Sequence, residues 1–318
     1  MIPKVELHLH LEGAAPPEFI RRLADEKHVD LSRIFDTDGA YAYDDFTGFL
    51  RCYEAATSVL QTPEDFARLT AEVLERQRDH GVIYTEIFLS PDFCGGRDLS
   101  AWRDYLAAIR EAARRVDGIS MRGIVTCIRH EGPEKARETA ICAAETAGDF
   151  VTGWGMGGDE RMGKATDFAW AFDCAREAGL GITCHAGEFG GPDSVRDALR
   201  LRPSRIGHGV RSIEDDALVD RLAEDGIVLE VCPGSNVALG LYPDIRRHPV
   251  ERLRARGVPV TISTDDPPFF HTDMSAEYDA LSDAFDWDES LFAEIARTAA
   301  RAAFCDADTR KTLLERLQ

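Results

Sequence analysis

Short apolar runs alternate with longer amphipathic stretches along most of this chain. Each apolar run has the length of a buried strand and ends at Gly, Pro or a polar turn residue. The runs predict eight β-strands, at residues 5–10, 82–89, 120–127, 150–155, 181–185, 205–208, 227–232 and 258–264.

Helical periodicity fills the stretches between these strands. It predicts helices at residues 63–80, 100–115, 133–147, 164–178, 212–224 and 249–256. Pro63 and Pro133 suit the first turn of a helix, where no backbone N–H is needed. Glycines stand where C-terminal helix caps are expected, at Gly81, Gly179, Gly226 and Gly257.

Repeated strand–helix units in one chain indicate a (β/α)8 barrel, the TIM-barrel form of the α/β class. A doubly wound open sheet is the main alternative, because it has the same alternation of strands and helices. Two features favour the barrel: the count of eight strands, and the lack of a G-x-G-x-x-G segment after the first strand. We expect one domain over residues 1–318.

Two segments depart from the simple strand–helix repeat. Residues 16–62 are too long for one crossover helix, so we expect an inserted helical pair that could cover the mouth of the barrel. Phe46, Phe49 and Tyr53 fall at i, i+3 and i+7 there, a stripe more typical of core packing than of ligand contact. Residues 275–318 predict two or three helices that close the barrel.

Charge and composition narrow the class of partner. The 318 residues carry a net charge of −20, which argues against nucleic acid or an anionic membrane as partner. The eight cysteines form no CxxC pair, so we expect reduced, mostly buried thiols. No signal peptide is recognisable, and no apolar run approaches the roughly 18 residues that span a bilayer, so a cytoplasmic protein is expected. The sequence predicts no particular oligomeric state.

His8 and His10, at the end of the first predicted strand, are the most informative residues of the chain. Residues i and i+2 of a strand point to the same face, so both imidazoles can meet one metal ion. Gly13, Pro16 and Pro17 end the strand just afterwards. The pair therefore lies at the carboxyl end of a strand, where barrel enzymes have their active sites.

Three further strand ends carry polar groups of matching chemistry. Their segments 183–188, 206–209 and 263–267 contribute His185 and Glu188, then His208, then Asp265 and Asp266. Any one of these could be an ordinary turn residue. In a barrel all four strand ends face one cavity, so together they predict a functional site.

The residue types suit one catalytic zinc ion. Imidazole nitrogen and carboxylate oxygen are common zinc ligands, and His8, His10, His185 and Asp265 are the candidates. Zinc makes a neighbouring water easier to deprotonate at neutral pH. Glu188 could act as proton donor, since burial would raise its pKa. His208 and Asp266 could hold the attacking water and help remove its proton.

Missing motifs argue against two other metal sites. Two-metal barrel hydrolases usually bridge their ions with a modified lysine at the end of the fourth strand, but residues 150–155 contain none. The zinc signature of cytidine deaminases, H-x-E with P-C-x-x-C, is also missing. A two-metal ester or cyclic-amide hydrolase remains an alternative.

The chain resembles the adenosine deaminase family of the amidohydrolase superfamily over nearly its whole length. The resemblance rests on PKVELHLHLEG at 3–13, GDE at 158–160, HAGE at 185–188, RIGHG at 205–209 and STDDP at 263–267. It implies hydrolytic deamination of adenosine or 2′-deoxyadenosine, a small-molecule purine substrate, to inosine or 2′-deoxyinosine and ammonia. It also implies one Zn²⁺ per chain, held by the four ligands named above. A purine-binding protein without catalysis is an alternative.

The same resemblance implies roles for the other site residues. Glu188 would protonate N1 of the purine. His208 would orient and deprotonate the attacking water, and Asp266 would assist and contact N7. Gly158 would offer its N–H to N3, and His10 and Glu12 would complete the substrate contacts.

One departure bears on the substrate. Adenosine deaminases usually have His-Leu-Asp-Gly after the metal pair, whereas this chain has Glu12 before Gly13. Glu at this place also occurs in relatives that act on adenine or aminodeoxyfutalosine. Glu12 continues the strand parity of His8 and His10, so it is expected to face the pocket, with a solvated loop residue as the alternative. Gly158-Asp159-Glu160 resembles the adenosine enzymes instead, so a nucleoside is expected, with the other 6-aminopurines as alternatives.

The remaining histidines are expected to be structural or surface residues. They lie in predicted helices or loops, at His28, His80, His130, His248 and His271. Of these, only His271 follows a site segment closely enough to reach the rim of the cavity.

Overall fold

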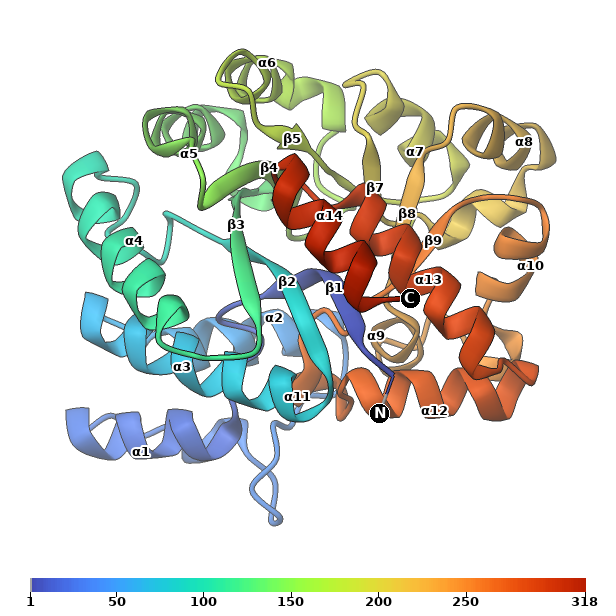
Figure 1. The fold of residues 1–318 in the computed structure, drawn as a ribbon. Coiled ribbons are helices and arrows are strands. Elements are labelled where there is room, and N and C mark those ends of the chain that lie inside the picture. Colours follow the sequence, from blue (N-terminus) through green and yellow to red (C-terminus); the bar gives the residue numbers. More distant parts are fainter. Residues whose placement is uncertain (1) are drawn as a thin grey trace.

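The computed structural model describes residues 2–318, with parallel strands at the centre and helices around them (Figure 1). One sheet consists of β1 (Lys4–His10), β2 (Val82–Leu89), β3 (Ser120–Ile128), β4 (Val151–Gly157) and β5 (Gly181–Ile182). The second consists of β6 (His185–Ala186), β7 (Arg205–His208), β8 (Val228–Val231) and β9 (Val260–Ile262). Within each sheet, every strand pairs with the next in the chain, as successive β/α units require.

Backbone hydrogen bonds link the two sheets where regular pairing is interrupted. Cys184 lies between β5 and β6, and its carbonyl accepts from Gly207 N–H at 3.0 Å. At the other junction, His10 N–H donates to Asp265 O and Asp265 N–H donates to His8 O, both at 3.1 Å. The last strand thereby meets the first. The predicted α/β fold of the TIM-barrel type is confirmed.

The helices that follow the strands form the outer layer. They are α3 (Pro63–Asp79), α4 (Leu99–Arg114), α5 (Pro133–Thr146), α6 (Ala169–Glu177), α7 (Pro192–Leu199), α8 (Asp216–Glu224) and α10 (Val250–Ala255). Two short helices begin directly after site strands, α9 (Pro233–Ala238) and α11 (Pro267–Phe270). Short 3-10 turns are η1 (Ser32–Ile34), η2 (Arg129–Glu131), η3 (Ala165–Phe168), η4 (Val210–Glu214) and η5 (Ile245–Arg247).

The two segments outside the repeat are helical, as predicted. The insertion contains α1 (Pro17–Lys27) and α2 (Phe46–Thr57), and the C-terminal segment contains α12 (Met274–Phe285), α13 (Glu289–Ala302) and α14 (Ala307–Arg316). In Figure 1 the red helices α13 and α14 cross in front of the strands. Arg205 of β7 donates to the carbonyl of Ala302 at 2.9 Å, which ties α13 to that end of the barrel.

The differences from the predicted elements are local. Helices α7, α9 and α11 were not predicted, because four to eight residues are too few to show helical periodicity. The predicted strand 181–185 divides into β5 and β6. Predicted helix 164–178 begins as a 3-10 turn, and Asp167 accepts from the N–H of Lys164 at its start.

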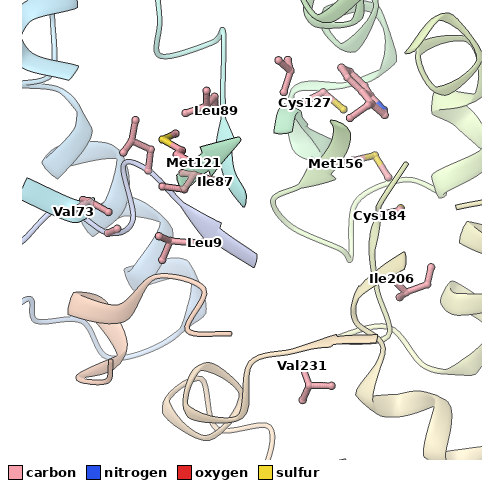
Figure 2. Packing of buried hydrophobic residues seen from close by; sticks show 14 of the residues in the cluster. Leu9, Val73, Ile87, Leu89, Met121, Cys127, Met156, Cys184, Ile206 and Val231 are labelled. Carbon is pink, nitrogen blue, oxygen red and sulfur yellow. The ribbon is translucent and has the colours of Figure 1, made fainter. Parts of the chain in front are cut away.

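Strand parity separates the core from the site. Figure 2 shows Leu9, Ile87, Met156, Ile206 and Val231, from five strands, among the buried hydrophobic side chains. These residues pack in one cluster with apolar side chains of the outer helices. In β1 the positions on either side of Leu9 carry His8 and His10 instead, because successive side chains of a strand point to opposite faces.

The helices show no membrane-spanning segment. Among residues 2–318, none of them combines the length and the apolar character that crossing a bilayer requires.

Candidate active site and metal centre

Four predicted metal ligands meet at the junction of the two sheets. Ligand atoms of His8, His10, His185 and Asp265 all lie within 4.8 Å of one another. Oδ1 of Asp265 lies 3.4 Å from Nε2 of His8 and 3.3 Å from Nε2 of His10. The Nε2 atoms of His10 and His185 are 3.3 Å apart. Three imidazoles and one carboxylate that converge in this way form a donor set typical of a divalent metal site.

Buried groups behind His8 fix the orientation of its ring. Nδ1 of His8 lies 2.8 Å from Oε2 of Glu230, so this nitrogen carries the proton and Nε2 faces the other ligands. Glu230 forms an ion pair with Arg205, and Nη2 of Arg205 lies 2.7 Å from Oε2 of Glu86. All of these side chains are buried.

The ligand atoms of this cluster are better placed to bind a metal than to form hydrogen bonds with one another. Nε2 of His8 is buried and has no hydrogen-bond partner among residues 2–318. An unpaired buried polar atom costs about 1–3 kcal/mol. The missing partner of this nitrogen is supplied when the cluster binds a cation.

The three predicted catalytic residues line one cavity beside this cluster. Glu188, His208 and Asp266 share its wall with His10, His185 and Asp265. Nε2 of His208 lies 3.7 Å from Oε2 of Glu188. Oδ1 of Asp266 and Oε1 of Glu188 are buried and have no partner among the described residues, so both are free to meet a ligand.

Burial shifts the pKa values of these groups in useful directions. Burial, with the charge of Asp265, raises the pKa of Glu188 well above its usual value. The same two causes raise the pKa of Asp266. Burial lowers the pKa of His208 to about 4, so its ring is neutral at pH 7. For Glu188, the raised pKa means that the carboxyl group can hold a proton at neutral pH and deliver it to a ligand. For Asp266, it means that the ionised carboxylate is a stronger base.

Backbone geometry at the two late strand ends is unusual. His208 has φ of 60° and Asp265 has φ of 67°, in the left-handed region that side chains other than glycine rarely adopt. Such strain is typical of functional sites. Gly13 leaves room for Asp266, because a Cβ at Gly13 would lie 1.5 Å from Oδ1 of that carboxylate.

Glu12 lies in the same cavity and not on the surface. Its side chain is buried, and its Oε1 has no hydrogen-bond partner among residues 2–318. Burial raises the pKa of Glu12 to about 8. The alternative of a solvated loop residue is therefore wrong.

The insertion covers this cavity with aromatic side chains. Phe46, Phe49 and Tyr53 of α2 line it. The expectation that this stripe is core and not ligand contact is wrong in part, because the three residues face the cavity as well as packing on the core cluster. Periodicity identified the apolar face of α2 but not what that face covers.

Gly158 and His130 form part of the cavity wall. Gly158 has φ of 89°, and a Cβ there would lie 2.9 Å from Nδ1 of His130, so glycine is required. His130 accepts from the N–H of Asp159 at 3.3 Å. His130 was expected to lie away from the site, whereas it lines the cavity. His271, which was expected to approach the rim, is exposed and is not among the lining residues.

Glu160 is a site residue that the sequence analysis missed. Its carboxylate accepts from the N–H groups of residues 187, 188, 189 and 190 at 2.6, 3.0, 2.7 and 2.8 Å. The hydroxyl of Ser194 also donates to it. Although burial opposes ionisation, the hydrogen bonds from Ser194, Gly190 and Gly187 lower the pKa of Glu160. Its ionised carboxylate therefore holds the loop that carries Glu188, a role that no local sequence pattern indicates.

Comparisons with known proteins agree with this site. A profile of the family described as adenosine deaminase matches residues 3–318. An adenine deaminase of Rhizobium leguminosarum bv. trifolii is 50% identical over 321 aligned residues, which cover 99% of each chain.

Two solved structures share the fold over nearly the whole chain. The crystal structure of an adenine deaminase from Arthrobacter aurescens has a TM-score of 0.90 and 29% identity, and covers 100% of this chain and 98% of that one. An amidohydrolase from Burkholderia ambifaria with bound zinc has a TM-score of 0.87 and 30% identity, and covers 98% of this chain and 88% of that one. The present chain therefore belongs to the adenosine deaminase family and is a hydrolytic deaminase that acts on a C–N bond.

Proposed function

We propose that this protein is a zinc-dependent deaminase of a 6-aminopurine, and that its substrate is adenine, which it converts to hypoxanthine and ammonia. The observation that carries the proposal is the single cavity in which the four-ligand cluster meets Glu188, His208 and Asp266. The small-molecule purine is the only partner we propose, with no nucleic acid or membrane, and the compartment we propose is the cytoplasm.

The proposed metal is one Zn²⁺ per chain, held by His8, His10, His185 and Asp265. The donor set is typical of zinc, and the Burkholderia relative was solved with zinc. Bound there, zinc would supply a Lewis acid that makes a neighbouring water molecule more acidic.

The chain's own residues would position the purine and move the protons. Glu188 would donate a proton to N1, which draws electron density from C6. His208 and Asp266 would hold the water that attacks C6 and promote the loss of its proton, and Asp266 would also contact N7. Gly158 would offer its N–H to N3, and His10 and Glu12 would complete the contacts. The proton taken from the water would then pass to the amino group, which leaves as ammonia. The hydroxyl that remains on C6 would become the carbonyl as its proton returns to Glu188.

Two features support adenine over adenosine. Relatives about 50% identical over the full length are named adenine deaminase. In addition, the buried Glu12 has a free carboxylate oxygen in the cavity. A free base carries a ring N–H that such an oxygen can accept from, whereas a nucleoside carries ribose at N9. A site built to pair with an N–H discriminates strongly against an analogue that lacks it.

Adenosine, the substrate expected from the sequence, is the second candidate, because the segment Gly158-Asp159-Glu160 resembles that of adenosine deaminases. The test is ammonia release by zinc-loaded enzyme with adenine, adenosine and aminodeoxyfutalosine in parallel. We expect rapid turnover of adenine alone. Rapid turnover of adenosine beside inert adenine would overturn the substrate proposal.

Two variants separate the proposed roles of Glu188 and His8. Glu188→Gln should retain zinc and lose roughly 100- to 10,000-fold in kcat, because it removes the proton donor. His8→Ala should lose zinc. Equal zinc loss in both variants would contradict the assignment, and ammonia release by metal-free enzyme would contradict the zinc site itself.

A further inference from the structure

A buried chain of hydrogen bonds leads from the backbone of α10 to His208. The N–H of Val250 donates to Nδ1 of His248 at 3.2 Å. Nε2 of His248 lies 3.1 Å from Oδ1 of Asn236, and Nδ2 of Asn236 lies 3.4 Å from Nδ1 of His208. The three side chains are buried, and His248 and Asn236 lie outside the cavity wall.

The first link fixes the direction of every other link. A backbone N–H can only donate, so Nδ1 of His248 must be an acceptor. Burial lowers the pKa of His248 to about 3, so its ring is neutral and its one proton lies on Nε2. That N–H donates to the oxygen of Asn236, which turns the amide NH₂ toward His208. Nδ1 of His208 is therefore an acceptor as well.

The opposite orientation of Asn236 fails at the same link. With the amide exchanged, its NH₂ would face Nε2 of His248, and that nitrogen would have to accept. Both nitrogens of His248 would then be acceptors, which a neutral imidazole does not allow. The N–H of Val250 thus determines the tautomer of His208, through the two side chains of His248 and Asn236 that lie between them.

We propose that Asn236 and His248 are positioning residues that fix the tautomer of His208, so that His208 presents Nε2–H to the reacting centre. In the proposed deamination His208 then serves as a hydrogen-bond donor to the oxygen that attacks C6. The proton of the water goes to the carboxylate of Asp266. The tautomer follows from geometry alone, whereas its use in catalysis rests on the proposed function.

The first test reads the tautomer directly. Zinc-loaded protein with ¹⁵N-labelled histidine is studied by NMR, and the signals of His208 are identified by their loss in His208→Gln. We expect a protonated Nε2 and an unprotonated Nδ1. A proton on Nδ1 would overturn the proposal. The NMR readout does not depend on turnover. It therefore tests the hydrogen-bond relay from His248 through Asn236 to His208 even if no purine is deaminated.

The second test reverses the direction of the hydrogen bond between residue 236 and His208. In Asn236→Asp, a carboxylate accepts from both histidines, which moves the proton of His208 to Nδ1. We expect the NMR signals to invert and kcat to fall about 100-fold, as for loss of one transition-state donor, while KM and zinc content stay close to wild type. If His208 acted as a base at Nε2, this variant would keep its activity. Unchanged kcat would therefore contradict the proposal.

A third variant keeps the test decisive where Asn236→Asp does not fold. His248→Phe removes the link that orients Asn236, so His208 should show a mixture of both tautomers and an intermediate kcat. A single unchanged tautomer in this variant would overturn the proposal. Tyr242→Phe is the matched control, because the ring of Tyr242 packs against His248 at 5.0 Å without a role in the relay. It should leave tautomer and kcat unchanged.

Discussion

At the residue scale, carboxylates outside the cavity wall hold a metal ligand and the loop of a catalytic residue in place. Glu230 orients His8 from behind, and Glu160 gathers four backbone N–H groups of the loop around Glu188. A carboxylate with several good donors is held rigidly, so it transmits a fixed position to its neighbours. The precision of the site therefore depends on charged residues that would be classed as core by burial alone.

Replacing Glu160 should test this dependence. Glu160→Gln places an NH₂ group against backbone donors, so the loop of residues 187–190 should loosen. We expect faster hydrogen exchange at these amides and a kcat lower by roughly 10- to 100-fold, because small misplacement of a catalytic group is costly. Zinc content should not change.

The control for this prediction is a double-mutant cycle. If Glu160 acts through Glu188, its replacement should have little further effect in Glu188→Gln enzyme. An equal loss of kcat in both backgrounds would mean that Glu160 acts by another route.

At the scale of elements, one buried carboxyl group joins the short helix α9 to the C-terminal helix α12. Glu277 of α12 accepts from the N–H of Gly234 in α9, at 3.1 and 3.0 Å to its two oxygens, and from the hydroxyl of Thr272 at 2.7 Å. Gly234 has to be glycine here, since a Cβ would lie 2.1 Å from Oε1 of Glu277. The contact joins two elements far apart in the sequence.

This junction should make stability depend on pH. Burial raises the pKa of Glu277 from 4.5 to about 7, so the folded state binds more protons than the unfolded state between these values. The contribution of Glu277 is complete below about pH 4.5 and is lost as pH rises through 7, on the order of 3 kcal/mol in all. Urea unfolding between pH 4.5 and 8 should show a shallower decline in Glu277→Gln than in wild type. Exposed Glu294→Gln is the control, and parallel curves for Glu277→Gln and wild type would refute the prediction.

Element prediction from the sequence succeeded where the pattern is long and failed where it is short. The sequence predicts the strand at Val82–Leu89 with its observed bounds, because a mostly apolar run of eight residues lies between Gly81 and Ser90-Pro91. The six residues of α9 and the four of α11 contain too few turns for a period to appear. The positions of α9 and α11 depend on how β8 and β9 are placed in the barrel, which only the tertiary structure shows.

At the scale of the whole molecule, the site lies on the seam where β9 meets β1. The hydrogen bonds between Asp265 and the backbone of His8 and His10 span this seam, and so do the side chains of the metal cluster. A metal bound there links the ends of the barrel that regular strand pairing leaves unjoined. Metal binding should therefore contribute to the stability of the fold and not only to catalysis.

Chelation should measure that contribution. At a free zinc concentration a thousand times Kd, binding stabilises the folded state by about 4 kcal/mol. Removing zinc should lower Tm by several degrees, while far-UV circular dichroism stays native because the apolar core lies elsewhere. Added zinc should restore Tm in wild type but not in His8→Ala. Equal Tm values with and without zinc would show that the seam holds without metal.

The assembled site was predictable from the sequence to the extent that its residues stand at strand ends. His10, Glu12, Gly158, His185, Glu188, His208, Asp265 and Asp266 line one cavity, as a barrel requires. Glu230, Asn236 and Glu160 were not predicted, because each acts through partners that are remote in sequence. The assignment of one domain to residues 1–318 stays a prediction.

The position of the seam also has a consequence for biosynthesis. Two imidazoles leave the ribosome with the first strand, but Asp265 emerges only after eight further strands, β2 to β9, have been made. A nascent chain thus exposes a pair of histidines long before the pocket that buries them exists. Full affinity for the cation can arise only at the end of translation, when the last strand meets the first. Uptake of the ion therefore indicates that the barrel has closed.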